Sequence, residues 1–133
     1  GRFKPGYEED LKKLKTGPFR MITRDEFISD EEMESTFQQS DVILRMNVNY
    51  FGSSGVVGIA ARYNKPVMVS DTGVMAELVV KYRLGDVVDP SDTADIRALF
   101  LQYRQSLPAV DGSTYRDTHD LRAFAETLLE DGL

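Results

Sequence analysis

The sequence predicts an α/β fold, with a parallel sheet covered by helices on both faces. Two short apolar runs, Asp41–Leu44 and Pro66–Val69, have the length and composition of buried strands. Between them, a loop at Gly52–Gly55 precedes apolar residues at helical spacing. A strand, a helix and a strand in this order form a right-handed crossover unit with parallel, neighbouring strands. We expect the ligand site of this unit where strands end and helices begin.

Three elements are predicted before this unit. A helix at Tyr7–Lys15 has acidic residues at its start and lysines at its end, which suits the helix dipole. The alternating residues Phe19–Thr23 indicate a strand. Ser29 and Glu32 have the spacing of a capping box, so a second helix is predicted from Ser29 to about Gln39.

The elements predicted after the unit continue this alternation of helices and strands. In chain order they are a helix at Val74–Tyr82, a strand at Asp86–Val88, a helix from Pro90 through Tyr103, a loop at Leu107–Ser113 and a helix at Leu121–Leu129. Helical periodicity also predicts that Tyr7, Phe37 and Phe100 face the core. The chain has 133 residues, a length that suits one domain, so residues 1–133 are expected to form a single domain.

Composition argues against several classes of function. The 22 acidic and 16 basic residues give a net charge of -6, which disfavours nucleic acid as a partner. The absence of cysteine excludes disulfides, thiolate metal sites and thiol nucleophiles. No apolar run reaches the roughly 20 residues of a transmembrane helix, and we expect a cytoplasmic protein without a membrane-spanning segment. His119, the only histidine, has no neighbouring metal ligands, and no metal is expected.

The loop that follows Arg45 is the candidate ligand site. Glycine lets the backbone approach a ligand closely, serine hydroxyls donate hydrogen bonds, and the following helix N-terminus favours anions. We therefore predict that a phosphate binds Gly52, Ser53, Ser54 and Gly55. The alternative is a flexible turn with a serine helix cap. Arg45 either contacts a phosphate or sugar or forms a structural ion pair.

The ordered series of segments resembles the nucleotide-sugar-binding half of GT-B glycosyltransferases. This large retaining family includes sucrose synthases and many bacterial sugar transferases, and the half in question is Rossmann-like. The segments that carry the resemblance span nearly the whole chain: Gly1 with the Tyr7–Leu14 helix, Phe27–Glu32, Ser40–Leu44, Gly52–Gly55, Lys65–Asp71, Thr72 and Gly73 with Glu77, and Leu84–Pro90.

The resemblance implies binding of a UDP- or GDP-type hexose donor, for transfer to an unknown acceptor. The diphosphate would lie over Gly52–Gly55, and Thr72 and Gly73 would form a second loop near the sugar. Glu77 would contact the sugar or phosphate, unless it is only a surface residue of its helix. No cofactor or metal is implied, because helix dipoles and basic groups neutralise the leaving diphosphate. No catalytic residue is assigned.

The sequence departs from the family at its E-x7-E pair of glutamates. The second glutamate, which hydrogen-bonds the ribose hydroxyls, falls on Ile59, and no residue from Val42 to Val69 is acidic. Unpaired ribose hydroxyls would cost about 1–3 kcal/mol. A degenerate relative that acts as a binding or assembly module is therefore the alternative function. An unrelated flavodoxin-like or response-regulator-like domain is a third option.

The resemblance also implies a fragment of a longer chain. In the family, an acceptor-binding half precedes the matching region, and so do a first strand and a helix. This strand and helix supply an arginine and a lysine to the diphosphate. We therefore expect an incomplete sheet that lacks its first strand, with an unpaired edge beside Asp41–Leu44. A swapped segment, a second copy or a changed strand order would fill this edge. The chain alone is not expected to catalyse transfer.

Overall fold

The computed structural model describes residues 5–18, 20–47, 52 and 55–120. The chain divides into two compact units, Gly1–Ser35 and Thr36–Leu133. The first unit holds α1 (Glu8–Lys15) and the start of α2 (Asp30–Gln39). The second unit holds the end of α2 and every later element.

In the first unit, the two predicted helices form and the predicted strand does not. The capping box of α2 is confirmed, because the Glu32 N–H donates to Ser29 Oγ at 3.1 Å and the Ser29 N–H donates to the Glu32 carboxylate at 3.4 Å. Residues 20–23 have no regular structure, so the strand prediction was wrong there. A strand needs a neighbour to pair its backbone groups, and the described part of this unit offers none.

The expected core position of Tyr7 was also wrong. Tyr7 is 54% exposed, and no residue of α1 is buried. An amphipathic helix buries its apolar face only when a second layer covers it.

The second unit is built on a parallel sheet, as predicted. Its strands are β1 (Ile43–Arg45), β2 (Val67–Ser70) and β3 (Gly85–Val88), in the spatial order β1-β2-β3. Ile43 lies in register with Val67, which in turn lies in register with Gly85. The central strand β2 is buried along its whole length, because it has a neighbour on each edge and helices over both faces.

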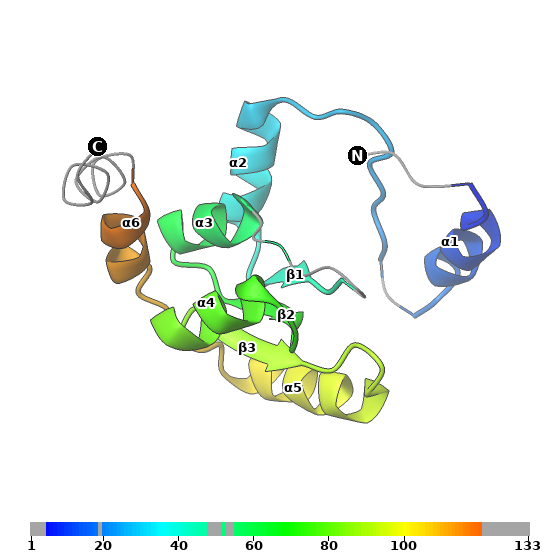
Figure 1. The fold of residues 1–133 in the computed structure, drawn as a ribbon. Coiled ribbons are helices and arrows are strands. Elements are labelled where there is room, and N and C mark those ends of the chain that lie inside the picture. Colours follow the sequence, from blue (N-terminus) through cyan, green and yellow to red (C-terminus); the bar gives the residue numbers. More distant parts are fainter. Residues whose placement is uncertain (1–4, 19, 48–51, 53–54, 121–133) are drawn as a thin grey trace. The chain divides into compact units, whose positions relative to one another are not determined.

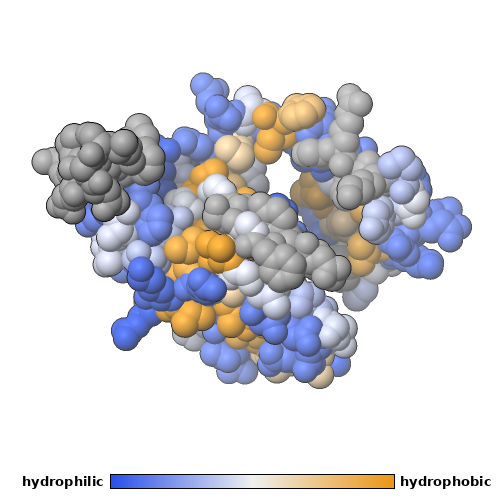
Figure 2. Space-filling model, in the orientation of Figure 1, coloured by the Kyte–Doolittle hydropathy of each residue, from blue (hydrophilic) through white to orange (hydrophobic). Residues whose placement is uncertain are grey.

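Helices cover both faces of this sheet (Figure 1). The connecting helices α3 (Gly55–Arg62) and α4 (Val74–Tyr82) lie on one side, and α5 (Thr93–Gln105) lies on the other. The Asp92 carboxylate caps α5 by accepting the N–H groups of Ala94 at 3.1 Å and Asp95 at 2.9 Å. Figure 2 shows apolar side chains over α4, where Val74 and Val80 are exposed.

Two apolar layers form the core of the second unit. Met68 and Val88 point to the face that α5 covers and pack with Tyr103. Val67 and Val69 alternate with Met68 and therefore point to the face of α3 and α4. The predicted burial of Phe37 is confirmed, at 8% exposed, whereas Phe100 is 38% exposed and was wrongly placed in the core.

A short helix, α6 (Ser113–His119), was not predicted from the sequence. It lies against α3 at a close approach of the two backbones. A Cβ atom on Gly112 would lie 2.0 Å from the Ala61 carbonyl oxygen, so only glycine fits this position. The helix predicted at Leu121–Leu129 lies outside the described residues.

Candidate functional site

The predicted site residues follow β1 and β2, at the edge of the sheet where these parallel strands end (Figure 1). Arg45 is the last residue of β1 and is half-buried. Gly52 is exposed in a bend, and Gly55 is the exposed first residue of α3. Because α3 and α4 both begin after this edge, their N-terminal ends and Arg45 give it positive character. Ser53 and Ser54 lie outside the described residues.

The second predicted loop leads from β2 into α4. Gly73 occupies the N-cap position with φ 82° and ψ -176°, a conformation that favours glycine, and no side chain of the described residues caps this helix. Its carbonyl oxygen accepts the Glu77 N–H at 3.3 Å. Thr72 and the Glu77 side chain are exposed. The first turn of α4 therefore has backbone N–H groups without a side-chain cap, and of its residues Val74 is exposed whereas Met75 and Ala76 are buried.

A buried serine joins the two strand ends. Ser70 is 2% exposed, and its hydroxyl both donates to the Asn47 carbonyl and accepts the Asn47 N–H, each at 2.7 Å. This pair of bonds fixes where the chain leaves β1 on its way to Gly52. Our sequence reasoning did not single out Ser70. The sequence feature that could have pointed to Ser70 is a serine at the end of an otherwise apolar strand.

The β2–β3 part of this edge is acidic. Asp71 and Asp89 are exposed and directly follow their strands. The Asp89 carboxylate accepts the Ser91 hydroxyl at 2.7 Å and the Ser91 N–H at 2.8 Å, and these bonds lower the pKa of Asp89. Acidic side chains repel an anion here, so an anionic ligand fits better on the β1 side, near Arg45.

No set of three or more His, Asp or Glu side chains in the described ranges is arranged to hold a metal ion. Likewise, no described helix is long and apolar enough to cross a membrane.

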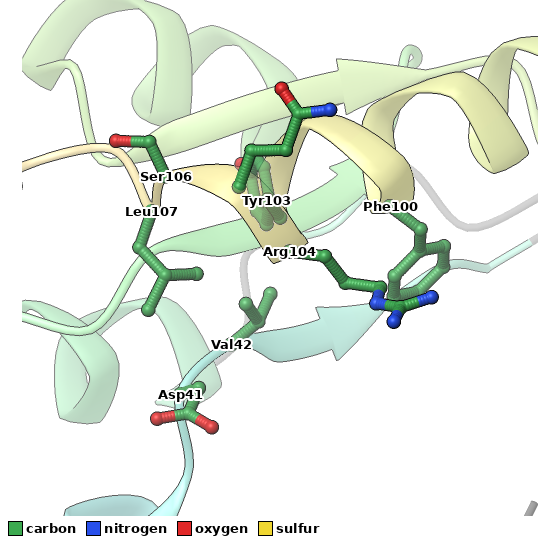
Figure 3. Close-up of a pocket in the computed structure, with 8 residues that line it drawn as sticks. Asp41, Val42, Phe100, Tyr103, Arg104, Ser106 and Leu107 are labelled. Atoms are coloured by element: carbon green, nitrogen blue, oxygen red, sulfur yellow. The ribbon is translucent and has the colours of Figure 1, made fainter.

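A separate pocket of about 460 Å³ lies at the other end of the strands, near the start of β1 (Figure 3). Asp41 and Val42, which precede β1, form one side, and the C-terminal half of α5 forms the other. The charged side chains of Asp41 and Arg104 lie at the margin of this pocket, and apolar side chains form its floor. Its lining residues are Asp41, Val42, Phe100, Tyr103, Arg104, Gln105, Ser106 and Leu107. None of the site residues predicted from the sequence belongs to this pocket.

Comparisons of this chain with protein-family models, with curated proteins and with solved structures find no match.

Proposed function

We propose that this chain binds a nucleoside-diphosphate sugar at the carboxyl edge of its sheet, as the donor-binding part of a longer GT-B-type glycosyltransferase. One observation carries the proposal. Gly73 opens α4 with a positive φ and no side-chain cap, at the same edge as the end of β1 with Arg45. A ligand that carries both a diphosphate and a sugar suits an edge with a basic side chain and a helix N-terminus that no side chain caps.

The candidate residues that the structure describes each have a role in this proposal. The diphosphate lies at the start of α3, near Gly52 and Gly55, with Arg45 as its basic contact. The sugar lies at the Thr72–Gly73 loop, where the absence of a side chain on Gly73 allows close approach. Glu77, exposed on the first turns of α4, accepts hydrogen bonds from sugar hydroxyls.

The alternative function is a binding or assembly module on a degenerate glycosyltransferase scaffold. The observation that favours it is Ile59, a half-buried aliphatic residue of α3 at the position where the family has its ribose-binding glutamate. The Ile59→Glu variant separates the two functions. A large gain in nucleotide affinity would support loss of an ancestral donor site, and unchanged affinity would point to a different native ligand.

Isothermal titration calorimetry of the chain with UDP-glucose, GDP-mannose, ADP-glucose and UDP tests the donor site. We expect at least one sugar nucleotide to bind with a dissociation constant below about 1 mM. In the Glu77→Gln variant, affinity for that sugar nucleotide should fall about tenfold, because the charged acceptor of the sugar hydrogen bonds becomes a neutral amide that is a weaker acceptor. Affinity for UDP should not change, because UDP carries no sugar that Glu77 would contact.

Asp95→Asn is the matched control, since Asp95 is also an exposed carboxylate in the first turn of its helix. Its affinities should equal those of the parent chain. Absence of binding by all four compounds would remove the donor-site proposal.

A further inference from the structure

The strand β3 has an outer edge with which no described strand pairs. In the order β1-β2-β3 it lies on the side of the sheet away from β1, so a strand added beside β1 does not cover it (Figure 1). The N–H groups of Val67 and Asp71 donate to the carbonyls of Leu84 and Val88, each at 2.9 Å, toward β2. Successive residues of a strand direct their backbone groups to alternate sides, so the N–H and C=O groups of Val87 point outward.

A pocket of about 250 Å³, which we call the β3 groove, opens at this edge on the face of α5. Val87 and Val88 of β3 and Leu99 of α5 contribute to its walls. Ligand sites for drug-sized molecules usually measure about 300–1,000 Å³, so a groove of this size suits a single long side chain better than a whole ligand. The outward backbone groups of Val87 lie beside that side chain.

The polar side chains of the β3 groove select a cation. Asp86 and Asp95 each contribute a carboxylate and Gln102 contributes an amide, whereas none of the described residues that line the groove is basic. Asp86 is held in place because its carboxylate accepts a hydrogen bond from the hydroxyl of the buried Tyr103. Guanidinium and ammonium groups donate their strongest hydrogen bonds to carboxylates.

The same charges argue against a second copy of this chain as the occupant. Two copies that paired through their β3 edges would bring two acidic grooves together, and acidic side chains at an edge discourage such pairing. A basic segment is attracted instead, so charge complementarity decides the kind of partner.

An apolar side chain lies beside this edge on the other face of the sheet. The helix α4 packs against β2 and β3, and the hydroxyl of its Tyr82 is bonded to Thr118 of α6, which lies against α3. Val80 is about 200° around the helix from Tyr82, so it lies on the side of α4 away from α3. It is 62% exposed, although Ala76, one turn earlier, is buried. A segment beside β3 therefore meets an acidic groove on one face and an apolar side chain on the other.

We propose that the outer edge of β3 binds an extended segment of a partner protein in which basic and apolar residues alternate. The segment bonds to the outward N–H and C=O groups of Val87 and becomes a fourth strand. Successive side chains of a strand point to opposite faces, so the basic side chains reach Asp86 and Asp95 while the apolar ones cover Val80. None of the candidate donor-site residues takes part.

Fluorescence anisotropy of a labelled seven-residue peptide of alternating valine and arginine, with blocked ends, tests this surface on the full chain. We expect a dissociation constant below about 1 mM. Two further peptides carry N-methyl groups either on every valine or on every arginine. Strand pairing uses the N–H groups of only one set, so one of these peptides should bind like the parent peptide and the other at least about tenfold more weakly. Loss with methylated valines indicates an antiparallel fourth strand, and loss with methylated arginines a parallel one.

Charge reversal tests the β3 groove itself. The Asp95→Lys variant should bind the peptide at least about tenfold more weakly, because an ammonium group replaces a carboxylate that faces the arginines. Asp117→Lys is the matched control, since Asp117 is an exposed acid of α6 that does not line the groove and the change in net charge is the same. Its affinity should stay within about threefold of the parent chain. Circular dichroism of both variants shows whether they are folded.

Absence of binding at about 1 mM chain would overturn the proposal. Equal binding of the two N-methylated peptides, or equal effects of Asp95→Lys and Asp117→Lys, would show attraction by net charge alone and would also overturn it.

Discussion

At the scale of single residues, the hydroxyl of Tyr103 donates a hydrogen bond to the Asp86 carboxylate between α5 and β3. Tyr103 is 5% exposed. Burial, followed by the hydrogen bond and negative charge of Asp86, raises the pKa of Tyr103 above its ordinary value near 10. The fold therefore holds the neutral phenol, and the ionised form is incompatible with the same packing.

The free energy of unfolding should consequently depend on pH through Tyr103. In the unfolded chain, Tyr103 loses its proton near pH 10, whereas the folded chain retains it. This contribution to stability is fully present below about pH 10 and is lost as the pH rises further. Urea unfolding at about pH 8 and about pH 11 should show a smaller loss of stability in Tyr103→Phe than in the parent chain. Equal losses in the two proteins would contradict this role, because the other tyrosines are common to both.

At the scale of elements, α6 supplies the cap of α3. The Arg116 guanidinium donates to the carbonyl oxygens of Ala61 at 2.7 Å and Arg62 at 3.4 Å, at the end of α3. Asn64 follows with φ 52°, and its side-chain oxygen accepts the Gly112 N–H at 3.0 Å. Carbonyl groups that a helix leaves unpaired are thus bonded by residues some fifty positions later in the chain.

Arg116→Met tests this cap. The substitution keeps an unbranched apolar chain but removes the guanidinium, so carbonyls at the end of α3 lose charged donors. We expect the free energy of unfolding to fall by about 1–3 kcal/mol, measured by urea denaturation. Arg97→Met, on the exposed surface of α5, is the control and should change it by less than about 0.5 kcal/mol. Equal effects of the two substitutions would show that the hydrogen bonds from Arg116 to α3 add nothing to the free energy of unfolding.

Patterns within a single element predicted the parallel sheet and its connecting helices. The apolar runs that form β1 and β2 are easily recognised in the sequence, and α4 has the predicted bounds Val74–Tyr82. Prediction failed where structure depends on distant residues. Residues 20–23 belong to a predicted strand but have no partner strand among the described residues, and the polar sequence of α6 is held by contacts with α3.

The candidate site was predictable only in outline, for the same reason. Glycines in the right order indicated the loops at the carboxyl edge. The bonds between Ser70 and Asn47 and the pocket between Val42 and α5 each join segments more than 20 residues apart, and no local pattern announces them.

At the scale of the whole molecule, the buried apolar residues of the described chain all lie between Phe37 and Tyr103. The first unit contributes none of them. Cooperative unfolding follows from a shared apolar core, so the second unit should unfold as one body without the residues before α2. The capping box of Ser29 and Glu32 lies before the first residue of this unit, Thr36, but the start of α2 needs it.

A chain that begins at Ile28 therefore keeps every residue on which this core depends, together with the cap of α2. We expect its free energy of unfolding to match that of the full chain within about 0.5 kcal/mol, in a single transition followed by circular dichroism in urea. The slope of that transition should differ little, because it scales with the buried surface that unfolding exposes, and none of the removed residues that the structure describes, 5–18 and 20–27, is buried. A loss of more than about 2 kcal/mol, or a broad transition, would mean that residues before Ile28 belong to the cooperative unit.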